Sequence, residues 1–238
     1  MNGLMPPNKL YYKSNFSVLF LFGLIILLPF IGIFSKVKYD LNLFFDFFQN
    51  SYTHRLIYFS VYQAFISAIL SCFLAIPFAL ALNRHKDLKI IKFIISLCGF
   101  CFVIPTILIV YAVIKLYGNN GFYNSYFNLY EYLSIETIFG IKAILIAHTL
   151  LNTPFATRLF IQSLNSIPSK YYEISGSLNI KFLGNLIRLE LPYIKQNFFS
   201  VFSIIFSLCF LSFAIVMALG GGPMYSTIEV AIYQYALF

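Results

Sequence analysis

Two pairs of residues have the types and the spacing that could support chemistry. Cys98 and Cys101 form a C-x-x-C pair, which is the spacing of redox dithiols. His148 and Asn152 lie four residues apart, so a helix would place both side chains on one face. A reactive thiolate needs access to solvent, and the cysteine pair falls inside an apolar run. We therefore attribute the spacing of the two cysteines to chance. His148 and Asn152 stay as candidates for a hydrogen-bonding or binding role.

The other residues do not combine into a catalytic, metal or cofactor site. The sequence has no G-x-x-x-x-G-K-[ST] phosphate loop, and the glycine run Gly220–Gly222 is more typical of a turn. Cys72 and Cys209 also lie in apolar runs, so we expect the four cysteines to be buried apolar residues rather than a disulfide framework. The sequence thus predicts no catalytic residue, no metal ion and no cofactor.

The elements that carry these residues must lie in a membrane. The 238 residues are 60% hydrophobic and only 10% charged, whereas soluble domains are about 45–50% apolar and about 25% charged. The mean hydropathy of +0.83 agrees with this. The composition predicts an all-α integral membrane protein with a single transmembrane domain over residues 1–238.

Five apolar runs are each long enough to cross about 30 Å of hydrocarbon. They are Phe16–Phe34, Leu56–Leu82, Phe93–Leu116, Phe139–Ile161 and Asn197–Leu219. A sixth run begins near Ile228, where about eleven residues remain, roughly half of what a crossing needs. We expect five complete transmembrane helices and the start of a sixth.

The positive charges predict the orientation of these helices. With the N-terminus in the cytoplasm, eleven of the 16 Lys and Arg residues fall on the cytoplasmic side, as the positive-inside rule requires. The cationic residues lie in short segments between apolar runs, not on one folded face, so the net charge of +8 does not indicate a nucleic-acid partner.

In this setting His148 and Asn152 have two interpretations. Polar groups within a membrane span usually face the interior of the helix bundle. In the interpretation that we favour, these side chains make hydrogen bonds to another helix. In the other, they line a translocation path.

The segment over residues 166–195 is too polar to cross the membrane and has a helical pattern. Apolar residues recur at helical spacing in two pieces, and Asn179 suits a bend between them because Asn tolerates the left-handed conformation. We expect two short amphipathic helices, with Pro192 opening the fifth span. The segment either lies on the bilayer surface or offers an apolar face and the Glu173 carboxylate to a cytoplasmic partner.

This segment resembles the EAA motif of ABC importer permeases. Glu173, a small residue two positions on, a turn residue at the sixth position and a final Leu-Pro match the motif, while Ile174 and Asn179 replace its usual Ala and Gly. The resemblance implies a type I importer permease bundle, and it assigns coupling to the ATPase to Glu173, Ser175, Gly176, Asn179, Leu191 and Pro192.

Within this superfamily, two further stretches, Ile144–Pro168 and Leu219–Gln234, resemble the thiamine permeases. The chain is similar to the N-terminal half of these two-half permeases, which implies a fragment or the product of a split or interrupted gene. The resemblance implies a multi-pass subunit of a bacterial inner membrane that transports thiamine or its phosphates by alternating access and is not itself an enzyme. The implied partners are a cytoplasmic ATPase dimer, a periplasmic binding protein and a second permease half. The alternatives are an iron(III) or other small-solute importer, and a membrane enzyme or scaffold that uses His148 or the Cys98 and Cys101 pair.

Overall fold

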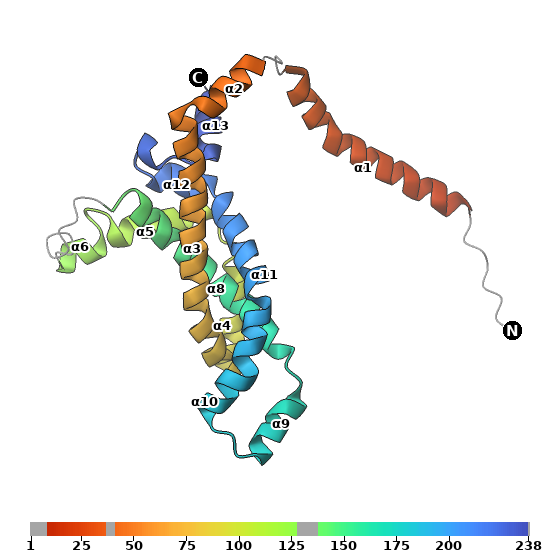
Figure 1. Ribbon diagram of the computed structural model, residues 1–238, viewed down its shortest axis with the longest axis vertical. Helices are drawn as coiled ribbons and strands as arrows, with labels where there is room; N and C mark the ends of the chain where they lie inside the picture. The colour runs from red at the N-terminus through yellow and green to blue at the C-terminus, as the bar shows by residue number, and fades with distance from the viewer. Residues whose placement is uncertain (1–8, 37–40, 128–137, 238) are drawn as a thin grey trace. The chain divides into compact units, whose positions relative to one another are not determined.

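The computed structural model describes residues 9–36, 41–127 and 138–237, and every regular element within these ranges is helical (Figure 1). The chain divides into two compact units, residues 1–50 and 51–238. The first unit contains α1 (Lys9–Lys36) and α2 (Leu41–Gln49). The apolar stretch Ser17–Ser35 lies within α1. The first predicted span therefore coincides with one continuous helix.

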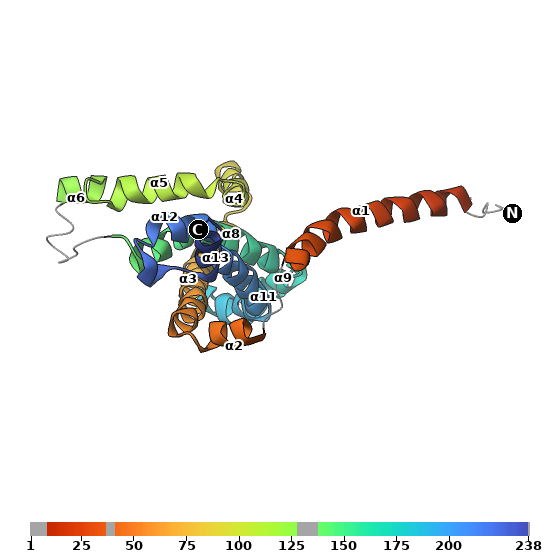
Figure 2. The same ribbon diagram turned by 90° about the horizontal axis from the view of Figure 1, so that it is seen from above.

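Three long helices form the centre of the second unit. They are α3 (Ser51–Arg84), α8 (Ile141–Asn165) and α11 (Leu191–Phe210), and each packs against the other two. Shorter helices pack beside them or extend from them (Figures 1 and 2): α4 (Lys89–Phe100), α5 (Thr106–Tyr117), α6 (Phe122–Phe127), α12 (Phe213–Leu219) and α13 (Ile228–Leu237). One hydrophobic cluster joins α3, α8 and α11, and a second joins α5, α8 and α12.

Small side chains allow α3 and α8 to pack closely. The buried residues of α3 recur every three or four positions and include Ser60, Ala64, Ser67, Ala68, Ser71, Cys72, Ala75 and Ala79. The buried positions of α8 include Ala143, Ala147 and Ala156. Lipid tails are as apolar as these side chains, so close van der Waals packing and polar contacts drive helix association in a membrane. The sequence of α3 provides both.

Four helical stretches of the described ranges are long and apolar enough to cross a membrane: Ser17–Ser35, Ser51–Arg84, Ile141–Asn165 and Phe182–Phe210. The second and fourth predicted spans lie almost entirely within α3 and α8. The helical fold is confirmed, while the predicted set of five complete spans needs two corrections.

The predicted third span, residues 93–116, is wrong as a single helix. The structure has α4 and α5 there, separated by residues 101–105. Pro105 precedes α5 with a ψ of 128°, and a proline also disfavours the helical conformation of the residue before it. The proline does not lower the apolar character of the run, so hydropathy alone missed the break.

The predicted fifth span, residues 197–219, is misplaced at both ends. The helix begins at Phe182 and ends at Phe210, and α12 is a separate helix. Ser212 has a non-helical ψ of 86° between the two helices. No glycine or proline marks this break, so no local breaker residue could have predicted it.

Two predictions at the end of the chain are confirmed. Gly221 and Gly222 have φ values of 71° and 141°, so the glycine run makes a turn after α12. The helix α13 starts at Ile228, where the sixth run was predicted to begin.

Candidate functional site

A bent pair of helices lies at one end of the second unit, away from α12 and α13 (Figure 1). The helix α9 (Ser169–Ser177) is followed by a bend and by α10 (Phe182–Asn185), which continues through the π-helical turn η1 (Leu186–Glu190) into α11. These elements contain the segment in which the sequence predicted two helices and a bend. We refer to α9, α10, η1 and the residues between them as the bent segment.

The bend at Asn179 has the geometry of a Schellman motif. Asn179 has a φ of 49°, and it is the non-glycine residue with a positive φ among those described. Its backbone N–H donates to the Gly176 carbonyl at 3.0 Å, and the Ile180 N–H donates to the Ser175 carbonyl at 3.0 Å. This pair of bonds satisfies carbonyls at the end of α9. The predicted bend is confirmed, with Asn in the position that glycine usually occupies.

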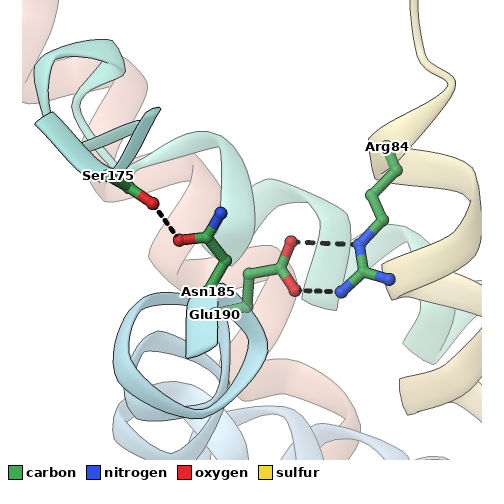
Figure 3. Close-up of polar contacts among 4 residues, drawn as sticks. All are labelled: Arg84, Ser175, Asn185 and Glu190. Atoms are coloured by element: carbon green, nitrogen blue, oxygen red, sulfur yellow. Dashed lines mark hydrogen bonds and ion pairs between the residues drawn. The ribbon is translucent and has the colours of Figure 1, made fainter. Parts of the chain in front are cut away.

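A side-chain hydrogen bond fixes the two arms of the bend. The Ser175 hydroxyl donates to Asn185 Oδ1, joining α9 to the last residue of α10 (Figure 3). Ser175 is buried. The small residue of the motif therefore acts inside the bent segment, where it sets the angle between the two helices.

An ion pair joins the base of the bent segment to α3. Arg84, the last residue of α3, donates through Nη2 to Glu190 Oε2 at 2.5 Å and through Nε to Oε1 at 3.3 Å (Figure 3). The Arg84 guanidinium also lies 3.9 Å from the centre of the Phe182 ring. Glu190 is only 3% exposed. Bidentate pairs of this kind fix orientation as well as distance.

Sequence reasoning missed this pair. The two residues are 106 positions apart in the chain, and no local pattern connects them. The available signal was a carboxylate directly before the Leu191-Pro192 step at the base of a span. A buried position there needs a cationic partner, but the sequence does not say which cation is near.

Tyr172 lies beside the ion pair. Burial raises the pKa of its hydroxyl, the Glu190 charge raises the pKa further, and the Arg84 charge lowers it. The hydroxyl is buried and has no hydrogen-bond partner among the described residues. Tyr172, Arg84 and Glu190 all line a cavity of about 740 Å³ between the ends of α3 and α8 and the start of α9. The inner side of the bent segment is therefore polar.

The outer side of the bent segment is apolar and exposed. Glu173 is exposed on α9, and a Cβ on Gly176 would meet no atom within 4 Å. The same segment also exposes large apolar side chains, and Leu178 is 67% exposed. The others are Tyr171, Ile174, Phe182, Leu183 and Ile187. We call this surface, Glu173 and Gly176 included, the outer face, and it has the composition of a docking site for a protein or a membrane.

Leu191 and Pro192 adjoin the outer face at Ile187. They line an apolar groove with Ile76 of α3 and Phe198 of α11. Pro192 lies in the first turn of α11, as predicted for the residue that opens the fifth span, although helical backbone also precedes it from Phe182. Pro192 cannot donate to the carbonyl four residues earlier, and the preceding π-helical turn shifts the hydrogen-bond register at that point.

His148 and Asn152 are both buried in the centre of the second unit. The Ser67 hydroxyl lies 3.1 Å from His148 Nδ1, and Asn152 Nδ2 donates to Cys209 Sγ at 3.2 Å. Each residue thus makes a contact between helices, as the favoured interpretation expected. Their role in a translocation path stays a prediction. Cys98 and Cys101 are free thiols at the end of α4.

Comparison with known proteins tests the resemblance to thiamine permeases. No family model matches the chain. The thiamine transport system permease protein ThiP of Haemophilus influenzae is 39% identical over 191 residues, and ThiP of Escherichia coli is 36% identical over 189 residues. These alignments cover 80% and 78% of this chain. The chain spans about a third of the length of these relatives, 35% and 34%. The resemblance to thiamine permeases is confirmed.

The solved structures show the fold. A bacterial ABC transporter involved in the import of the acidic polysaccharide alginate has a chain that aligns with a TM-score of 0.75 and 16% identity. The alignment covers 96% of this chain and 84% of that one. A bacterial alginate ABC transporter in complex with an alginate pentasaccharide-bound periplasmic protein gives a TM-score of 0.73. The chain therefore has the fold of an ABC importer permease.

Proposed function

We propose that this chain is part of the transmembrane permease of an ATP-driven ABC importer for thiamine or its phosphates. The fold and the relatives support the permease and the substrate. The observation that carries the coupling role is the bent segment, whose sequence resembles the EAA motif. It stands out from the long helices with an exposed outer face, and two polar contacts fix it internally and to α3.

In this proposal a cytoplasmic ATPase dimer docks on the outer face. The exposed apolar side chains supply buried area, and Glu173 supplies a charge for a cationic side chain of the ATPase. The chain has no phosphate loop, so the energy of ATP hydrolysis comes from this partner. The N-terminus lies in the cytoplasm of a bacterial cell, and the long helices cross the inner membrane.

Movement of the docked ATPase reaches the membrane helices through two polar contacts and one continuous helix. The Ser175 and Asn185 bond makes the two arms of the bend move together. The Arg84 and Glu190 pair transfers that movement to α3, and the continuous helix from Phe182 to Phe210 transfers it along α11. Together with a second permease half and a periplasmic binding protein, the helices alternate between outward and inward access.

Substitution of Glu173 by Lys tests the proposal. The reversed charge repels the cationic group of the ATPase, so we expect loss of ATPase copurification and of labelled thiamine uptake. Lys142→Glu is the control, because Lys142 is exposed at the start of α8, away from the bent segment. The complete transporter should be used in both assays, and ferric iron uptake should be measured beside thiamine uptake.

Retention of the ATPase by the Glu173→Lys variant would contradict the docking role. Crosslinking of the outer face to lipid headgroups in the intact transporter would then favour the membrane-surface interpretation. Loss of ferric iron uptake with unchanged thiamine uptake would contradict thiamine as the substrate and would still support an importer.

A further inference from the structure

Two interrupted helices border the same cavity inside the second unit. The cavity has a volume of about 340 Å³. Its wall includes the break between α4 and α5 (Cys101, Phe102 and Ile104) and the break between α11 and α12 (Leu211 and Ser212). The middle of α8 completes the wall with His148 and Asn152, among others. Both interruptions and the polar pair of α8 thus meet at one place.

Neighbouring side chains stabilise the second break. Gln63 of α3 donates through Nε2 to the Cys209 carbonyl at 3.1 Å and to the Ser60 carbonyl at 3.2 Å. Asn152 contacts the sulfur of the same Cys209. Interrupted backbone at membrane depth is tolerated where it is buried in protein or lines a cavity, and interrupted helices are typical of transporter binding sites. The break between α11 and α12 is therefore held in place by specific hydrogen bonds.

His148 has one ring nitrogen without a partner. Nδ1 is satisfied by Ser67 on α3, whereas Nε2 is buried and has no hydrogen-bond partner within the described ranges. The side chain is only 1% exposed. A buried polar atom without a partner is unfavourable. His148 lines the cavity, but Nε2 itself is closed to solvent, so a ligand in the cavity would reach this nitrogen after a local shift of the surrounding side chains.

The cavity wall defines the chemistry of that ligand. No charged residue is among those that line it, and the polar side chains are few: Cys101, Thr106, His148, Asn152 and Ser212. Phe102 and Phe155 stack with ring centres 5.0 Å apart, and Phe213 adds a third ring to the wall. An aromatic wall with a few hydrogen-bonding groups suits a flat ring that carries nitrogen atoms.

We propose that this cavity binds the heteroaromatic ring of the transported substrate, with His148 Nε2 hydrogen-bonded to a ring nitrogen or a ring amine. Either tautomer of His148 suits such a ring, because an aminopyrimidine offers both an acceptor and a donor. The inference rests on the proposed function, since it names the membrane contact of the substrate. It extends that function by placing the contact at the two helix breaks and not on the bent segment.

Native cysteines provide the test. Cys101 lines the cavity, whereas Cys98, one turn earlier, does not. In membranes that contain the complete transporter, N-ethylmaleimide labelling of each cysteine is followed by mass spectrometry, with and without saturating thiamine. We expect thiamine to slow labelling of Cys101 several-fold and to leave Cys98 unchanged. Choline, a cation without an aromatic ring, should protect neither residue.

A variant pair assigns the protection to His148. His148→Ala should lose the protection of Cys101, whereas Ser71→Ala should keep it, because Ser71 is buried on α3 and does not line the cavity. The primary comparison uses the unsubstituted chain, so it does not depend on the folding of a variant.

Other results would overturn the inference. These are no protection of Cys101, equal protection of both cysteines, or equal protection by choline. Thiamine uptake and ATPase copurification are measured in the same membranes. If both persist without protection of Cys101, the cavity assignment is wrong and the proposed function stands. If the unsubstituted transporter takes up no thiamine, both proposals are wrong.

Discussion

The helix α3 contacts the helical stretch from Phe182 to Phe210 at two places with different chemistry. At one end Arg84 makes a charged, bidentate pair with Glu190, and near the other end the neutral amide of Gln63 donates to the Cys209 carbonyl. The contacts are about 30 Å apart along either helix at 1.5 Å per residue, close to the thickness of the hydrocarbon layer. The Arg84 side chain is 25% exposed, whereas Gln63 is fully buried. The comparison shows that charge is used where solvent is near and a neutral hydrogen bond where it is not.

The largest predicted effect comes from breaking the charged contact. Arg84→Ala leaves the Glu190 carboxylate buried without a partner, and we expect a loss of about 3 kcal/mol, the low end for a buried pair because Arg84 is partly exposed. Thermal unfolding in detergent measures this. The double variant Arg84→Met with Glu190→Leu should recover most of the stability but not thiamine uptake. Full recovery of uptake would show that the pair has no role in coupling.

Breaking the neutral contact should have a smaller effect. Gln63→Leu removes the donor to the Cys209 carbonyl at the end of α11, at a cost of about 1–2 kcal/mol. Equilibrium unfolding in mixed micelles measures it, with Ser71→Ala as the matched buried control on α3. An effect as large as that of Arg84→Ala would contradict the distinction between the two contacts.

Substitutions at the bend should be milder still. Asn179→Ala places a residue without a local hydrogen-bonding side chain at a φ of 49°, which costs about 1 kcal/mol. Asn179→Gly removes the Cβ constraint, and we expect it to be neutral or slightly stabilising. Both variants should be compared by thermal unfolding and by ATPase copurification. A destabilising glycine would mean that the Asn side chain contributes more than its tolerance of the left-handed region.

The smallest effect should be seen at high pH. The pKa of Tyr172 is raised above its ordinary value of 10.0 in the folded chain. The unfolded chain therefore loses this proton first, so the stability is present below pH 10 and declines as the pH rises through the folded pKa. Tyr172→Phe should reduce the decline above pH 10, as unfolding measured against pH will show. An unchanged decline would indicate that Tyr172 ionises normally.

The parts of the fold that follow local rules could be predicted from the sequence. Apolar length predicted α3 and α8, the tolerance of Asn179 for the left-handed region predicted the bend, and Gly220–Gly222 predicted a turn. Apolar length failed between residues 93 and 116 because Pro105 interrupts the helix without changing its polarity.

The remaining features depend on residues that are distant in the chain. The break at Ser212 is stabilised in part by Gln63 of another helix, and the partner of Glu190 is Arg84, at the end of α3. Helical spacing carries no information about such pairs. The outer face and Glu173 could be predicted because they belong to one continuous segment. The contacts that join this segment to the membrane helices could not.

The bidentate pair has a mechanical consequence. A guanidinium and a carboxylate joined by two hydrogen bonds share a plane, so they resist torsion about the line between them, whereas the single bond from Gln63 acts as a swivel. Movement of the bent segment would therefore carry the end of α3 with it, whereas the Gln63 contact would let α11 turn about its own axis. Because α11 ends before Ser212, that rotation can stop at the helix break and leave α12 in place.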